Sequence, residues 1–372
     1  MNTRRTAGFI PLTCLIIIVL CALLAGCDVN VSTSSFGGDS GLTTGSSQGT
    51  TPCQSNCTTG SGAQGVQVFV EPDAGSQVIT SAINNAQKSV WLEMYLLTNR
   101  SVISSLEEAA HRGVDVRVML ETHPYGGGST SPTETMDRLR AAGVQVRSTN
   151  PAFALTHEKG MIVDGSTVFI TTANYTLSAL GGSSSTKNRE YGIIDTNQQD
   201  VQAVTSIFNA DWNRTTPRFD DPNLVVSPIN SRHDFESLIN GAHHTLLIEA
   251  EEMQDSDIEQ AIVNAAKRGI QVQVILPSPH GSSSDSEGSS DSNSAGIQTI
   301  EQGGAQVRED PRLYMHAKII VVDGQKAFVG SENISTASLD KNRELGIIVS
   351  DQNVLNTLQQ TFQQDWGDSQ SA

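Results

Sequence analysis

The chain has 372 residues, with 23 Lys and Arg against 40 Asp and Glu, and its formal net charge at pH 7 is −17. With 37% hydrophobic residues in regular runs, the composition argues against a disordered chain, a collagen-like chain and a protein of many membrane spans. The acidic balance also argues against electrostatic capture of nucleic acid, because such proteins gain much of their affinity from basic surfaces that release counterions. A small, locally basic pocket is still compatible with this acidic balance.

The first 26 residues are typical of an export signal. Arg4 and Arg5 precede an apolar run over 9–24, and the run ends in Leu-Ala-Gly-Cys at 24–27. This ending resembles the bacterial lipobox, which implies cleavage before Cys27 and attachment of acyl chains there. We therefore expect an exported protein, lipid-anchored in the bacterial cell envelope at Cys27, with a net charge of −19 after the two arginines are removed. A plain transmembrane anchor and a soluble secreted product are the alternatives.

A tether is predicted over 27–62. This stretch is rich in Ser, Thr and Gly and has neither Lys nor Arg, which is typical of a flexible linker. Cys53 and Cys57 lie in it, and an oxidising compartment permits them to pair, although the sequence leaves the pairing open. No cysteine follows Cys57, so a thiol nucleophile and a thiolate metal site are excluded from the rest of the chain.

An internal duplication follows the tether. The segment 111–120, His-Arg-Gly-Val-Asp-Val-Arg-Val-Met-Leu, recurs at 267–276 as Lys-Arg-Gly-Ile-Gln-Val-Gln-Val-Ile-Leu. Self-similarity at a nearly constant offset is the signature of a repeated structural unit. We therefore predict a first half over 63–217 and a second half over 218–372.

Strand and helix patterns alternate within each half. The predicted strands are 89–97 and 114–120 in the first half and 245–251 and 270–276 in the second, and the predicted helices are 102–112 and 258–268. This alternation predicts an α/β sheet with helices on its faces.

The motif His-x-Lys-x4-Asp occurs once in each half. Its members are His157, Lys159 and Asp164 in the first half and His316, Lys318 and Asp323 in the second. The apolar, β-branched run in each copy predicts that the motif begins a strand. Since residues i and i+2 of a strand face the same side, histidine and lysine should point together.

Two further polar elements recur after the motif. An asparagine stands ten residues past each aspartate, as Asn174 and Asn333, and the tripeptide Asn-Arg-Glu follows at 188–190 and 342–344. We expect the arginines of these tripeptides to pair with acids rather than to reach a phosphate.

Together these elements resemble the phospholipase D superfamily, whose doubled motif is His-x-Lys-x4-Asp-x6-Gly-Ser-x-Asn. The second copy, with Ser331 in the Gly-Ser position, matches at every residue, whereas the first copy has Thr171-Thr172 there. The resemblance covers nearly all of 63–372. It implies an α/β fold of two duplicated α/β/α halves of phospholipase D type, packed with a shared active site at their interface.

Cleavage of a phosphodiester anion requires positive donors on the phosphoryl oxygens, an in-line nucleophile and an acid for the leaving oxygen. We expect one imidazole, His157 in preference to His316, to attack phosphorus and form a phosphohistidine. The other imidazole would protonate the departing alcohol and then activate water.

The remaining polar residues of the motifs would support this pair. Phosphoryl oxygens would be held by Lys159, Lys318, Asn174 and Asn333. Glu190 and Glu344 would accept from Nδ1 of the imidazoles and fix their tautomer. Turn geometry, rather than contact with substrate, is the role expected of Asp164, Asp323 and Ser331.

The expected function is that of a phospholipase D-like hydrolase, a phosphodiesterase that cleaves a phospholipid head group beside the membrane. We expect no cofactor and no metal site, because lysines supply the charge that a divalent ion supplies elsewhere. A monomer is plausible, since both motif copies are in one chain. The alternatives are a nuclease, which the net charge disfavours, a phosphatidyltransferase, and a catalytically silent envelope-binding protein.

Overall fold

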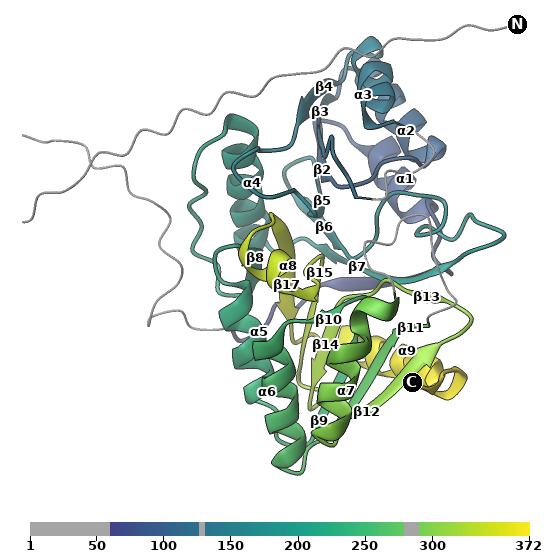
Figure 1. Cartoon of the computed structure of the whole chain (residues 1–372). Helices are drawn as coiled ribbons and strands as arrows, with labels where there is room; N and C mark the ends of the chain where they lie inside the picture. The colour runs from purple at the N-terminus through teal and green to yellow at the C-terminus, as the bar shows by residue number, and fades with distance from the viewer. Residues whose placement is uncertain (1–59, 126–130, 279–289) are drawn as a thin grey trace, which may run out of the picture. The chain divides into compact units, whose positions relative to one another are not determined.

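The computed structural model describes residues 60–125, 131–278 and 290–372, which belong to one compact unit (Figure 1). The export signal, Cys27, Cys53 and Cys57 lie outside the described residues, and so does nearly all of the tether. No helix in the described ranges has the length and apolarity needed to cross a membrane.

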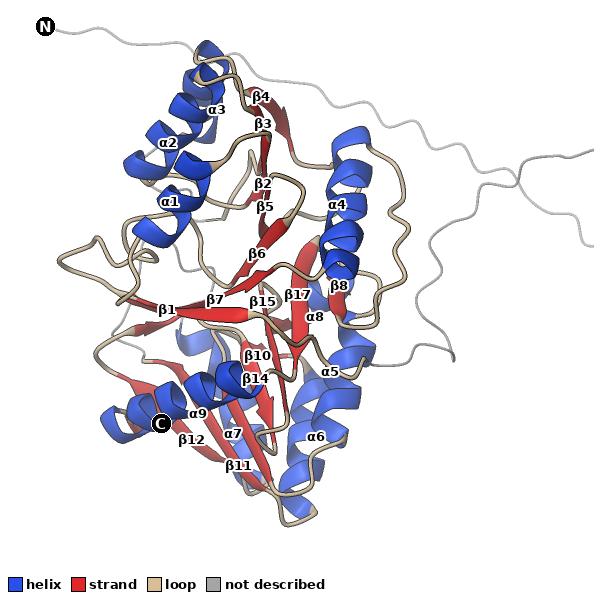
Figure 2. Cartoon of the chain, turned by 180° about the vertical axis from the view of Figure 1, so that it is seen from behind, coloured by secondary structure: helices blue, strands red, loops and turns tan. Residues whose placement is uncertain are grey.

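The first half forms a mixed sheet in the order β1-β7-β6-β5-β2-β3-β4. Its strands are β1 (Gln67–Glu71), β2 (Ser89–Met94), β3 (Asp115–Leu120), β4 (Gln145–Ser148), β5 (Lys159–Val163), β6 (Thr167–Thr171) and β7 (Asn188–Asp195). Three helices cover one face and a fourth covers the other, as Figures 1 and 2 show: α1 (Gln77–Asn85), α2 (Arg100–His111) and α3 (Pro132–Ala141), opposite α4 (Gln198–Asn213). Strands β2, β3 and β4 run parallel, and the other neighbours on this path are antiparallel.

The second half repeats this strand order as β12-β11-β9-β14-β15-β17-β8, with β18 added at the β12 edge. The strands are β8 (Leu224–Ser227), β9 (Thr245–Glu249), β11 (Gln271–Pro277), β12 (Gln306–Asp310), β14 (Ile319–Val322), β15 (Lys326–Gly330), β17 (Glu344–Val349) and β18 (Gln370–Ser371). The helices are α5 (Ser231–Asn240), α6 (Ser256–Lys267) and α7 (Ser294–Gln302) on one face and α9 (Gln352–Asp368) on the other (Figure 2). Short elements complete this half: β10 (Met253–Gln254), η1 (Ser290–Asn293), β13 (Tyr314–Met315), β16 (Ile334–Ser335) and α8 (Thr336–Asp340).

A central hydrophobic core joins the two halves. Buried side chains of α4, including Phe208 and Trp212, and of α9, including Leu358 and Phe362, belong to the same cluster as residues of both sheets. A further cluster lies under the outer helices of the first half, and another lies under those of the second half. Burial of such side chains contributes roughly 1.5–3 kcal/mol each, so the interface is itself a major source of stability. The fold is therefore the predicted pair of duplicated α/β/α halves.

The motif histidines differ from the prediction in one respect. They were expected to begin strands, but β5 starts at Lys159 and β14 at Ile319, so His157 and His316 precede them. The backbone beside each histidine pairs instead with the other half, through Thr156 with Arg343 and through β13 with β7. Sequence periodicity does not reveal this change of partner.

Candidate active site at the seam of the two halves

Both motif histidines lie where the halves meet. The N–H groups of His157 and Glu158 donate to the carbonyl of Arg343 over 2.9 and 3.0 Å. In the second half, Tyr314, two residues before His316, pairs with Asn188 of β7. Each histidine therefore lies against the Asn-Arg-Glu strand of the opposite half.

The histidine–glutamate pairs are exchanged between the halves. Nδ1 of His157 is 2.9 Å from Oε2 of Glu344. Nδ1 of His316 is 2.7 Å from Oε1 of Glu190. All four side chains are fully buried. A carboxylate at Nδ1 orients the ring and leaves Nε2 as the reactive nitrogen.

Each of these glutamates is itself held by hydrogen-bond donors. Ser338 Oγ donates to Glu344 over 2.7 Å, and Thr172 Oγ1 donates to Glu190 over 2.6 Å. Burial raises the pKa of Glu344, but the charge and hydrogen bond of His157 outweigh it and bring the pKa below its usual value. Glu344 is therefore an ionised acceptor.

The arginines of the tripeptides are exchanged in the same way. Nε of Arg189 donates to Asp365 over 2.5 Å, and Nε of Arg343 is 2.8 Å from Oδ2 of Asp211. Both aspartates come from the Asp-Trp pairs that end each half of the repeat. The arginines thus pair with acids across the seam.

The two motif lysines are buried next to their histidines. Nζ of Lys159 donates to the carbonyl of His157 over 2.6 Å, and Nζ of Lys318 donates to that of His316 over 2.7 Å. In the first half the Tyr95 ring contacts both side chains: its centroid is 4.8 Å from that of the His157 ring and 5.3 Å from Nζ of Lys159.

Glu251 occupies the corresponding place in the second half, and sequence reasoning did not identify it. Its Oε2 is 2.8 Å from Nζ of Lys318 and 3.4 Å from Nε2 of His316. The Tyr314 hydroxyl donates to its Oε1 over 3.0 Å. The available signal was an acid at the end of a predicted strand, which alone does not indicate contact with a motif 65 residues later.

The motif asparagines are buried beside these groups. Among the described residues, neither amide atom of Asn174 has a hydrogen-bond partner, and Oδ1 of Asn333 has none. The backbone N–H of Asn333 donates to Ser338 Oγ, which in turn donates to Glu344. A buried amide without a partner is costly, so both side chains are suited to a polar ligand.

The motif aspartates organise turns in identical ways. Asp164 accepts from the N–H groups of 87–89, and Asp323 accepts from those of 243–245. Both have positive φ, 54° and 53°, which the short side chain of Asp tolerates better than most. These hydrogen bonds lower the pKa of both carboxyls, although burial opposes them.

Thr172 takes the structural place of Ser331. Leu345 N–H donates to Ser331 Oγ over 3.0 Å, and Tyr191 N–H donates to Thr172 Oγ1 over 2.9 Å. The first copy lacks Gly-Ser, but its Thr172 keeps a hydroxyl that accepts from the strand of the Asn-Arg-Glu tripeptide, as Ser331 does in the second copy.

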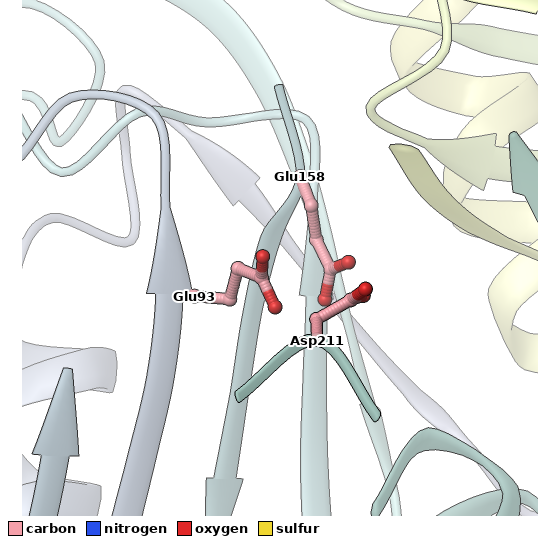
Figure 3. Close-up of side chains that lie close together, drawn as sticks. All are labelled: Glu93, Glu158 and Asp211. Carbon is pink, nitrogen blue, oxygen red and sulfur yellow. The ribbon is translucent and has the colours of Figure 1, made fainter. Parts of the chain in front are cut away.

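Behind the first motif lies a buried carboxylate cluster. Glu93, Glu158 and Asp211 point toward one another in Figure 3, and one oxygen from each lies within 4.8 Å of the others. Burial, with a smaller contribution from the charge of Asp211, raises the pKa of Glu158 to about 8. Arg343 supplies a compensating charge through Asp211. The cluster is a set of buried acids supported by an arginine.

Comparison with known proteins finds the same family in both halves of the chain. The family model described as "Cardiolipin synthase, PLD-like domain" matches twice, at residues 79–212 and 235–366. The chain belongs to the phospholipase D superfamily. It is an enzyme of this superfamily, whose reaction class is phosphodiester chemistry.

Individual relatives in the superfamily are distant. The chain is 24% identical to a cardiolipin synthase of Oceanobacillus iheyensis over 81% of its own length and 68% of that protein. It is also 24% identical to cardiolipin synthase B of Escherichia coli, over 79% of its length and 78% of that protein. A probable cardiolipin synthase of Bacillus subtilis is 20% identical, and there the chain spans only 64% of the relative.

A solved structure supports the fold of the superfamily. The phosphatidylserine synthase of Haemophilus influenzae superposes with a TM-score of 0.60 at 14% identity, covering 84% of this chain and 88% of that one. At this identity the likeness concerns the fold alone.

Proposed function

We propose that the protein is a phospholipase D-type phosphodiesterase that acts on the head-group diester of a phospholipid through a phosphatidyl-histidine intermediate. The observation that carries the proposal is the exchanged pairing of both motif histidines, His157 with Glu344 and His316 with Glu190. This pairing orients two imidazoles at the seam of the halves, and a buried lysine lies next to each histidine.

The proposed reaction has two steps. Nε2 of His157 attacks phosphorus and forms a P–N bond, while the P–O bond to the head-group alcohol breaks and its oxygen takes a proton from Nε2 of His316. In the second step an acceptor hydroxyl gives a proton to His316, forms a new P–O bond and displaces His157. Lys159, Asn174 and Asn333 would hold phosphoryl oxygens throughout.

The acceptor distinguishes two candidate functions. Water gives hydrolysis to phosphatidic acid, and a lipid alcohol gives phosphatidyl transfer. The relatives named as cardiolipin synthases favour the second candidate. The intermediate is the same for both, so the first step is independent of this choice.

We also propose that acyl chains on Cys27 hold the enzyme at an envelope membrane, near its substrate, and that it works as a monomer. The lipobox-like end of the apolar run supports the anchor. Replacement of Cys27 by Ser should release the protein from membranes and abolish labelling with fatty acid.

The decisive test uses the full chain with vesicles of phosphatidylglycerol, phosphatidylethanolamine or phosphatidylcholine. Mass spectrometry should detect phosphatidic acid or cardiolipin, and the products of His157→Gln serve as the blank. Cleavage of single-stranded DNA but of no phospholipid would contradict the proposal and favour the nuclease alternative.

A further inference from the structure

Tyr95 and Glu251 hold equivalent positions in the duplication. Lys159 pairs with Met94 at the end of β2, and Ile319, which follows Lys318, pairs with Glu249 at the end of β9. Tyr95 directly follows Met94 and lies beside Lys159 of the first motif. Glu251 comes two residues after Glu249 and lies beside Lys318 of the second motif. The same site in the fold therefore carries a neutral ring in one half and a carboxylate in the other.

The carboxylate changes the surroundings of the second histidine. His316 lies between Glu190 at Nδ1 and Glu251 at Nε2, over 2.7 and 3.4 Å. Two buried carboxylates therefore flank this ring, one at each nitrogen. His157 has Glu344 at Nδ1, and the Tyr95 ring lies nearly perpendicular to its own.

Glu251 is ionised in this environment. Burial raises its pKa, but the charges of His316 and Lys318, with a smaller effect of His157, hold the pKa well below its usual range. The Tyr314 hydroxyl orients the carboxylate from the opposite side.

We propose that Glu251 is a positioning residue that keeps the proton on Nε2 of His316, so that the second half supplies the acid and His157 supplies the nucleophile. The inference rests on the proposed phosphodiester function. In the first step the leaving alcohol oxygen takes this proton from Nε2 of His316. The P–O bond breaks as the P–N bond to His157 forms. Tyr95 places no charge beside the attacking ring.

The test compares two diesters that differ in their need for an acid. Phosphatidylglycerol releases an alcohol, which must be protonated, whereas bis(p-nitrophenyl) phosphate releases a stable phenolate. Glu251→Gln should lower kcat/KM for phosphatidylglycerol by about 100-fold or more, in line with the usual contribution of a general acid, and change the nitrophenyl reaction little. Equal losses on both substrates would show a merely structural role and overturn the inference.

The matched control is Glu301→Gln, which removes an exposed carboxylate of α7 in the same half. It should leave both reactions unchanged. A wild-type chain that cleaves neither diester would contradict the proposed function, and then a second measurement decides the role of Glu251.

That measurement is nitrogen NMR of the full chain with ¹⁵N-labelled histidine, assigned with His316→Gln. The nitrogen signals of the His316 ring should report a proton on Nε2 in the wild type and should change in Glu251→Gln, while those of His157 should be the same in both proteins. An identical His316 ring in the two proteins would refute the inference whether or not the enzyme is active.

Discussion

The two halves share a strand order and a set of exchanged pairs, yet they differ at single positions around the motif. Position 95 is tyrosine where position 251 is glutamate, and position 158 is glutamate where position 317 is alanine. The turn aspartates, Asp164 and Asp323, keep identical hydrogen bonds. The comparison indicates that the turns of the duplicated framework are retained, while the charge around the motif differs between the halves; the proposed roles assign that difference to different chemical tasks.

The largest expected effect separates the two histidines. His157→Gln should lower phosphodiester cleavage by about 10⁴-fold or more, because it removes the nucleophile. His316→Gln should also fail on phospholipid, but with bis(p-nitrophenyl) phosphate it should still form a phosphoenzyme. Peptide mapping should place the phosphoryl group on His157. A label on His316 in the His157→Gln protein would reverse the assignment.

The exchanged arginines provide a stability comparison. Arg189→Leu and Arg343→Leu each leave a buried aspartate without its partner, which should cost about 3–5 kcal/mol of the free energy of unfolding. The loss should be greater for Arg343, since Glu93 and Glu158 lie near its partner Asp211. Denaturant unfolding followed by circular dichroism measures both. Equal or inverted losses would show that these two glutamates do not depend on Arg343.

The exchanged glutamates should affect different steps. Glu344→Gln removes the carboxylate that orients His157, and should slow phosphoenzyme formation about 100-fold. Glu190→Gln acts on His316, and should slow alcohol release more than nitrophenolate release. Rapid-quench kinetics with both diesters distinguishes the steps, with exposed Glu134→Gln as control. Identical profiles for the two variants would contradict separate tasks for the halves.

The smallest expected effect concerns the buried acid that only the first motif carries. The pKa of Glu158 is about 8 in the folded protein against an ordinary value of 4.5, so the folded state binds more protons between these values. Its contribution to stability is therefore complete below about pH 4.5 and is lost as pH rises through 8. Glu158→Gln should flatten the decline of Tm between about pH 5 and 8, by a few degrees. Parallel Tm curves for variant and wild type would contradict this assignment.

Much of the fold was predictable because its signals are local. The apolar runs predicted β3 and β11 to within a residue, and the repeat predicted two matching halves. The His-x-Lys-x4-Asp motifs indicated the residues at the seam. Glu251 was missed, since it lies just after β9 and contacts Lys318, 67 residues away, and no periodic pattern reports such a contact.

The sequence by itself determined the duplication, the α/β class and the chemistry-bearing groups, because apolar periodicity and motif spacing are properties of the chain. Only the tertiary structure decided which glutamate faces which histidine: Glu344 serves His157 and Glu190 serves His316. It also placed a carboxylate beside one histidine and an aromatic ring beside the other. The physical reason is that the halves bury one core together, so strands distant in sequence become neighbours, and side-chain charges act over distances in space rather than along the chain.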